Sequence, residues 1–268
     1  MIIEYVDGMQ IDIADHNLRR LYHYVPSLEV EHSTATIDGH ADIITQTRFK
    51  RRMITVDFML KSYDTFDYYL LRDEINALFA IHESFYIIFK REPYKRYKVL
   101  LAKQFEVPPQ KRLGQFTITF IMVDLYAESI ASTSDTKEWD VDKWAWNGLI
   151  SWDDDLQYTF DSNTFTVANL GNVVIDPRYC VLDITLTGVF NNHVTIKNTT
   201  TGDVYTYNGA LTTSDTLVLS GVKSLKNGVS VFKDTNKKLI TLAVGNNTFT
   251  VEGGTLTSIA FNFRFLFK

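Results

Sequence analysis

The sequence predicts a mainly β protein of the α+β class, with one α-helix, divided into two domains. Strict alternation of apolar and polar residues recurs in both halves of the chain, as in residues 54–60 and 259–267. A helical spacing of apolar residues is sustained in one place, residues 63–81. After Ser129 the composition turns polar and rich in Asp and Trp, which is typical of a connector.

Length supports the division into domains. A chain of 268 residues is long for a single hydrophobic core. We therefore expect an N-terminal domain over residues 1–130, a connector over residues 131–150 and a C-terminal domain over residues 151–268.

The N-terminal domain begins with a predicted hairpin over residues 1–13. Asp7-Gly8 suits the positive φ angles of a tight two-residue turn. Residues 14–50 are polar and irregular in period, which predicts an extended loop or an arm with short strands. This segment and the hairpin are our candidates for contacts with neighbouring copies.

The rest of the N-terminal domain alternates strands with one helix. Residues 51–62 predict a strand, and residues 63–81 predict a helix capped by Asp64. Residues 83–91 and 95–103 predict strands on either side of a turn at Glu92-Pro93-Tyr94. A strand that runs into a loop is expected over residues 104–114, followed by the alternating strand of residues 116–122.

The sequence of the C-terminal domain predicts short strands bounded by Gly, Asn, Asp and Thr, and it shows no helical pattern. Regular spacing with such turn signals favours an antiparallel β-sandwich. The expected strands cover residues 164–171, 179–188, 193–207, 216–221, 228–232, 239–251 and 258–267.

Composition and charge argue against several classes of function. A formal net charge of −5, with no basic half, disfavours nucleic-acid binding, which needs a basic excess to release counterions. No apolar stretch reaches the length of a membrane span, and the first residues lack the features of a signal peptide. Cys180 is the single cysteine, so we expect no disulfide and an inert thiol in a strand-like run.

The sequence gives only weak signals for a catalytic or ligand-binding site. Residues 153–155, together with Glu138, Asp140 and Asp142, offer carboxylates for a glycosidase or a cation site, but a solvated acidic connector fits equally well. The six histidines show no zinc spacing. Four tryptophans in the connector (Trp139, Trp144, Trp146 and Trp152) could stack on sugars or pack the two domains together. We select no catalytic, cofactor-binding or metal residue and expect no cofactor and no enzyme activity.

The order of motifs resembles one known family. "RRMITVDFML", "YYLLRDEINALFAI", "FYIIFKREPYKRYKVLLA" and "GQFTITFIMVDLYAES" follow one another, then "VANLGNVVIDPRY", "TIKNTTTGDVYTYNGAL" and "VGNNTFTVEG". This order is similar to that of the distal tail (Dit) proteins of long, non-contractile-tailed phages of Gram-positive bacteria. Leu125 stands where the family pattern has a proline. The matching signature positions are Tyr126, Ala127, Glu128, Ser129, Asn169, Gly171, Asp176, Pro177 and Arg178.

The resemblance implies a fold and a task. By this resemblance, the N-terminal domain of the chain would be a β-sandwich or barrel-like ring domain with one helix. The C-terminal domain would be a galectin-like β-sandwich. Six copies would form a ring that joins the tail tube protein to the tail-tip hub or tail-associated protein. The ring would also anchor receptor-binding or upper baseplate proteins. Such a structural protein works in the virion, at the phage tail tip, after assembly in the host bacterial cytoplasm.

Some alternatives stay open at this point. The assembly could be a single ring, a dimer of rings, or a monomer that assembles only with its tail partners. A carbohydrate-binding module that contacts the host cell wall is the second functional reading. In either case we interpret the stub from Tyr126 to Ser129 as a hinge, because it closes a regular strand and opens the polar connector.

Overall fold

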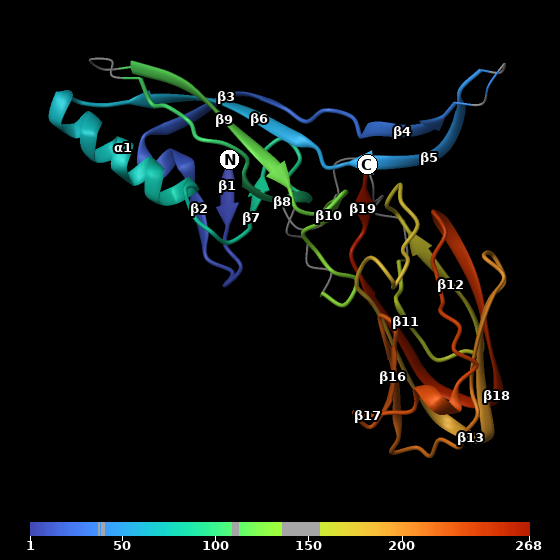
Figure 1. The fold of residues 1–268 in the computed structure, drawn as a ribbon. Helices are drawn as coiled ribbons and strands as arrows, with labels where there is room; N and C mark the ends of the chain where they lie inside the picture. Colours follow the sequence, from blue (N-terminus) through green and yellow to red (C-terminus); the bar gives the residue numbers. More distant parts are fainter. Residues whose placement is uncertain (37, 39–40, 109–112, 136–155) are drawn as a thin grey trace. The chain divides into compact units, whose positions relative to one another are not determined.

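The computed structural model describes residues 1–36, 38, 41–108, 113–135 and 156–268. These residues divide into two compact units (Figure 1). The first unit comprises Met1–Ala127 with Lys268, and the second comprises Glu128–Phe267. Residues 136–150 of the predicted connector lie outside the described residues.

The first unit is built on an antiparallel sheet whose strands run in the order β2-β1-β7-β8-β9-β6-β3. The bounds are β1 Ile2–Glu4, β2 Gln10–Asp12, β3 Leu18–Tyr24, β6 Met53–Lys61, β7 Phe85–Ile88, β8 Lys95–Leu101 and β9 Leu113–Met122. A short 3-10 turn, η1 (Ile13–His16), joins β2 to β3.

The alternating strands β6 and β9 form the centre of this unit. Their inward side chains, among them Ile54, Phe58, Ile118 and Phe120, are fully buried. The helix α1 (Thr65–Phe79) begins at Asp64, whose carboxylate accepts hydrogen bonds from the N–H groups of Phe66 and Asp67. The predicted strand, helix and cap are thus confirmed.

Helix α1 joins this core through Phe79. The Phe79 ring centroid lies 5.5 Å from that of Phe58 and 5.6 Å from that of Phe120. Edge and tilted contacts at these distances are favourable for aromatic rings. The helix therefore packs on the sheet through its C-terminal turn, and its buried side chains are Tyr68, Leu71, Ile75, Leu78 and Phe79.

Residues 14–50 are more regular than their sequence suggests. Strand β3 pairs with β6 in the main sheet, and β4 (Glu29–Ala35) pairs with β5 (Ile43–Lys50) in a separate two-stranded sheet. A bulge between Arg20 and Tyr22 shifts the register of β3. A bulge moves later side chains to the opposite face, so the alternation that identifies a strand is lost.

Two local predictions for the first unit need correction. The first hairpin forms, but Glu4 pairs with Gln10, so its loop holds five residues rather than two. Gly8 has a φ of +87° in that loop. Residues 104–108 form no strand; the Val107 carbonyl instead accepts a hydrogen bond from the Tyr68 hydroxyl at 2.6 Å, and Pro108 has no N–H to donate to a sheet.

The second unit consists of antiparallel strands around two very long ones, β13 (Leu182–Asn198) and β18 (Gly245–Phe263). The sheet order is β11-β18-β13-β15-β16-β17, with β12 on β18 and β14 on β13. The other bounds are β10 Ala127–Ser129, β11 Thr159–Phe160, β12 Thr164–Asn169, β14 Asp203–Tyr207, β15 Thr216–Ser220, β16 Lys223–Lys226, β17 Val229–Ser230 and β19 Leu266–Phe267; η2 (Phe232–Asp234) is a 3-10 turn.

Both long strands fold over and so contribute to two layers. Phe249 and Phe261 lie on the same strand, and twelve extended residues would separate them by about 40 Å. Their ring centroids are 5.0 Å apart. Phe165 of β12 stacks on Phe249 at 5.5 Å, so the aromatic core lies between the two layers.

The strands fold over at bulges that contain glycine. The pairing of β13 with β18 shifts at Thr187/Gly188 and again at Phe190/Thr195. Opposite the second shift, Gly253 has a φ of +106°, and a Cβ there would lie 2.2 Å from the His193 carbonyl oxygen. Only glycine allows this backbone geometry and this close approach.

These bulges explain the corrections in the second unit. Two expected strands, residues 179–188 and 193–207, were predicted as separate, but residues 182–188 and 193–198 both belong to β13. Residues 179–181, which include Cys180, precede the strand in a turn rather than extending it. Likewise, β18 joins parts of the expected strands 239–251 and 258–267, while residues 239–244 lie outside it. The class is confirmed: the described chain is mainly β, its sheets are antiparallel, and it contains one α-helix.

Candidate interaction surfaces

The stub from Tyr126 to Ser129 lies where the two units divide. Ala127 and Ser129 are buried, and Tyr126 and Glu128 are half-buried. Ser129 forms two hydrogen bonds with Phe265, just before β19. The Ser129 N–H donates to the Phe265 carbonyl at 2.8 Å, and the Ser129 hydroxyl accepts the Phe265 N–H at 3.0 Å. The hydroxyl also donates to the Ala131 carbonyl. The hinge role of this stub stays a prediction.

Gly171 meets the same C-terminal segment, and Asn169 holds the loop that contains Gly171. Asn169 is 1% exposed; its amide donates to the Val173 carbonyl and its oxygen accepts the Gly171 N–H. A Cβ on Gly171 would lie 2.5 Å from the Leu266 carbonyl oxygen. Ser129 and Gly171 therefore contact adjacent residues, Phe265 and Leu266, and Asn169 supports Gly171 from its own loop.

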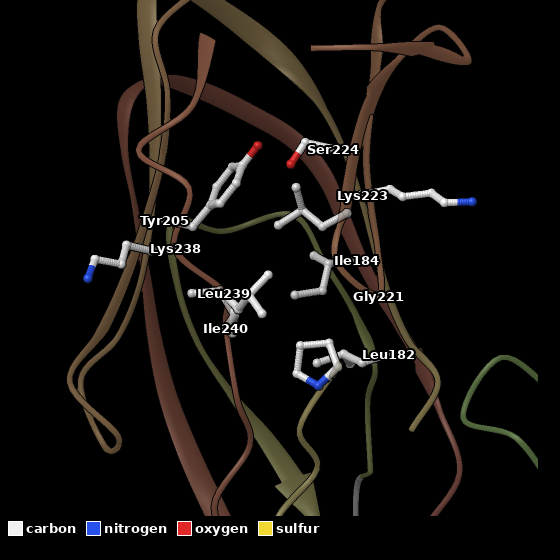
Figure 2. Close-up of a pocket in the computed structure, with 11 residues that line it drawn as sticks. Leu182, Ile184, Tyr205, Gly221, Lys223, Ser224, Lys238, Leu239 and Ile240 are labelled. Carbon is white, nitrogen blue, oxygen red and sulfur yellow. The ribbon is translucent and has the colours of Figure 1, made fainter. Parts of the chain in front are cut away.

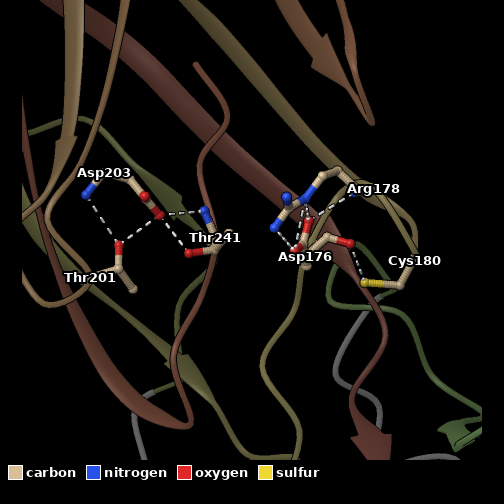
Figure 3. Close-up of polar contacts among 6 residues, drawn as sticks. All are labelled: Asp176, Arg178, Cys180, Thr201, Asp203 and Thr241. Carbon is tan, nitrogen blue, oxygen red and sulfur yellow. Dashed lines mark hydrogen bonds and ion pairs between the residues drawn. The ribbon is translucent and has the colours of Figure 1, made fainter. Parts of the chain in front are cut away.

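Asp176, Pro177 and Arg178 form a turn elsewhere in the second unit (Figure 3). The Asp176 carboxylate accepts bonds from the Arg178 N–H and guanidinium, and the ion pair measures 2.5 Å. Hydrogen bonds from Arg178 lower the pKa of Asp176. Pro177 is buried, while the Arg178 side chain is exposed. This arrangement is a self-contained turn.

Cys180 belongs to the same turn. Its thiol donates to the Asp176 carbonyl at 3.0 Å. Burial raises the pKa of this thiol. A protonated, half-buried thiol is a poor nucleophile, so the geometry gives Cys180 a structural role.

One small pocket opens near this turn (Figure 2). The Tyr205 hydroxyl and Ser224 point toward each other, and the ammonium groups of Lys223 and Lys238 point away. No carboxylate, histidine or cysteine lines this pocket; its residues are Pro177, Leu182, Ile184, Tyr205, Leu219, Gly221, Lys223, Ser224, Lys238, Leu239 and Ile240. The pocket thus lacks the imidazole and carboxylate groups that most often act as general acid or base.

The half-buried Asp203 carboxylate accepts several hydrogen bonds within the second unit. One oxygen accepts bonds from the Thr241 N–H and hydroxyl and from the Thr201 hydroxyl (Figure 3). These bonds tie β14 to the segment before β18. Among the described residues, no group of three or more His, Cys, Asp or Glu is placed to hold a metal ion. Within the same residues, no helix has the length and apolar character that crossing a membrane requires.

Several candidate residues predicted from the sequence lie outside the described residues. They are the carboxylates Glu138, Asp140 and Asp142, residues 153–155, and the four connector tryptophans. The glycosidase, cation and sugar-stacking hypotheses for the connector are therefore not tested by the structure.

The β4-β5 ribbon, which we call the arm, has two unlike faces. Its register places Glu29 and Glu31 opposite Lys50 and Arg48 on one face, where Lys50 forms ion pairs with both glutamates. The opposite face carries Val30, Ile44 and Phe49, which are 45%, 59% and 49% exposed. We call these three residues the arm apolar face.

Helix α1 also exposes large apolar side chains. Phe66 and Leu70 lie one turn apart and are 83% and 71% exposed, and Tyr63 before the helix is 85% exposed. We call these three residues the helix outer face. The spacing of Phe66 and Leu70 was visible in the sequence, but a helical period does not say which of two apolar stripes faces the core.

Two comparisons with known proteins find similarity to phage tail proteins. Residues 9–122 match the family model described as phage tail protein RIFT-related domain. No curated protein matches the chain. Of the solved structures, the crystal structure of the Dit protein of phage SPP1, a paradigm of the hub adsorption apparatus in phages infecting Gram-positive bacteria, matches with a TM-score of 0.70 and 16% identity. The alignment covers 99% of each chain.

Two structures of the phage p2 baseplate in its activated conformation, with Sr and with Ca, also align. They are 9% and 10% identical, cover 98% of this chain and 96% and 97% of those chains, and have TM-scores of 0.46 and 0.47. The SPP1 match shows that this chain has the fold of a distal tail protein, so the predicted resemblance is confirmed for the fold. Together, the family match and the fold support a structural component of a phage tail.

Proposed function

We propose that this protein is a ring adaptor at the distal end of a phage tail. Six copies close around the tail channel, join the tail tube protein to the tail-tip hub and anchor host-recognition proteins. The chain acts as a scaffold in the virion and not as an enzyme. The family match of the first unit and the shared fold of the whole chain support this function.

The observation that carries the proposal is the arm apolar face. Val30, Ile44 and Phe49 are each about half exposed. A two-stranded ribbon is marginally stable by itself in water, and burying an apolar side chain contributes about 1.5–3 kcal/mol. Packing of this face on a neighbouring copy would stabilise the arm and the assembly together.

Light scattering of the purified protein tests the ring, alone and with its tail tube and hub partners. We expect a hexamer of about 185 kDa, six times the 30.8 kDa chain. A dimer of rings, or assembly that requires the partners, also supports a ring adaptor. A monomer in every setting would overturn the proposal.

A matched pair of arm variants tests the role of the arm. Phe49→Asp places a charge on the arm apolar face, and we expect it to abolish assembly because burying an unpaired carboxylate is costly. Gln46→Asp places the same charge on the opposite face, and we expect it to assemble normally. If the two variants assembled to the same extent, the arm apolar face would not be part of the interface.

A further inference from the structure

We propose that the arm apolar face of one copy packs on the helix outer face of a second copy. This inference rests on the proposed ring and identifies the two surfaces that would meet in it. It concerns two apolar surfaces that their own chain leaves exposed.

The helix outer face is not needed for the core of its own unit. Helix α1 already buries the opposite stripe, which includes Leu71, Ile75 and Phe79. Phe66 and Leu70 stay more than 70% exposed. Contiguous exposed apolar side chains of this size are typical of an interaction site.

The two surfaces lie on segments that adjoin opposite ends of strand β6. The arm ends at Lys50, just before β6 begins at Met53, and the helix begins at Thr65, just after β6 ends at Lys61. Nine residues of strand span about 30 Å. Figure 1 shows α1 and the β4-β5 arm beyond opposite ends of β6. The two surfaces of one copy are therefore placed to meet those of different neighbours.

Contacts between two different surfaces are heterologous. Such a contact repeats from copy to copy and closes into a ring when the rotation between copies allows it, whereas a two-fold dimer needs a self-complementary patch. The arm and the helix differ in both shape and charge. Their pairing therefore suits a ring of the proposed kind.

The charges beside the two surfaces are complementary. Arg51 follows Phe49 by two residues, and Arg48 precedes it on the charged face of the arm; neither arginine forms an ion pair in the part of the chain that the structure describes. Phe66 lies between Asp64 and Asp67, whose carboxylates accept backbone N–H groups of Tyr63, Phe66 and Asp67. Opposite charges around an apolar centre favour one partner and one register. This complementarity selects a second copy as the occupant.

A complementation experiment tests the contact. Phe49→Asp disables the arm and Leu70→Asp disables the helix outer face, and we expect each variant alone to be monomeric by light scattering. A 1:1 mixture still holds one intact arm and one intact helix face. We expect it to form a dimer of about 62 kDa, twice 30.8 kDa, and nothing larger. Asn76→Asp, an exposed change elsewhere on α1, should assemble like the unmodified protein.

The outcomes separate this inference from the proposed ring. A Leu70→Asp protein that stays hexameric would overturn the contact and leave the ring intact, with the helix face free for another partner. A mixture that stays monomeric, with both variants folded by circular dichroism, would also overturn the contact. An unmodified protein that never assembles would instead contradict the proposed function.

Discussion

At the scale of residues, two of the buried tyrosines of the second unit, Tyr158 and Tyr205, differ in their hydrogen bonds. Tyr158 donates a hydrogen bond to the Ala168 carbonyl at 2.9 Å. The Tyr205 hydroxyl is buried and faces Ser224 across the pocket, but it forms no hydrogen bond of normal geometry. Burial raises the pKa of both phenols, that of Tyr205 to about 12. A buried polar group without a partner costs stability, whereas a bonded one adds to it.

Tyr158→Phe should lower the free energy of unfolding by about 1 kcal/mol, because the Ala168 carbonyl loses its donor. Tyr205→Phe should leave that energy unchanged or raise it by up to about 1 kcal/mol. Urea denaturation of the two variants and the parent measures both values. Equal losses would mean that the Tyr205 hydroxyl has found a partner, such as Ser224 across the pocket.

Alkaline pH provides a second test of Tyr205. Its pKa in the folded state, about 12, lies above the value of about 10 for an exposed tyrosine. The stability that comes from keeping this phenol neutral is complete below pH 10 and is lost as the pH rises toward 12. We therefore expect the parent to lose more stability than Tyr205→Phe between pH 10 and 12, as measured by unfolding at each pH. Parallel pH profiles would contradict the burial of this phenol.

At the scale of elements, the sequence predicted what periodicity can show. Strands β6 and β9 and helix α1 lie where they were expected, because each has one uninterrupted period. Strand β3 and the continuity of β13 and β18 could not be predicted in this way. In each case a bulge reverses the alternation, and a glycine in a bulge has the same sequence signature as a glycine in a turn.

The fold-over of β18 makes a prediction about two of its glycines. Gly253 and Gly245 both have positive φ, but a Cβ on Gly253 would meet the His193 carbonyl oxygen at 2.2 Å, and one on Gly245 would meet nothing within 4 Å. Gly245→Ala should cost about 1 kcal/mol through its backbone conformation. Gly253→Ala should cost about 1–3 kcal/mol more, because the two strands must move apart.

Thermal unfolding of the two glycine variants checks this difference. The shared positive φ makes Gly245→Ala a control for backbone strain, so the gap between the variants reports the close approach alone. Equal midpoints for the two variants would mean that β13 and β18 do not approach at this bulge as the structure shows.

At the scale of the whole molecule, the signature positions of the sequence lie apart along the chain from the proposed contact surfaces. Ser129 and Gly171 are internal and contact the C-terminal segment, and Asn169 is internal and supports Gly171. The arm and the helix outer face lie instead on segments whose sequence looks polar or ambiguous. The apolar pattern of a sequence identifies the side chains that the chain buries in its own core. The apolar side chains of an interface are buried only by a neighbour, so they are recognised when the structure shows that they are exposed in the single chain.

Assembly also makes the stability of the first unit depend on protein concentration. Folding that is coupled to the formation of a hexamer gains about 1 kcal/mol per chain for each tenfold rise in concentration, because six unfolded chains must be brought together. We expect the urea midpoint of the parent to rise with concentration and that of Phe49→Asp to stay constant, since this variant lacks the neighbour that covers the arm. Gln46→Asp serves as the control and should follow the parent. A parent midpoint that does not change over a hundredfold range of concentration, while light scattering still detects a hexamer, would mean that the ring forms without adding to the stability of its subunits.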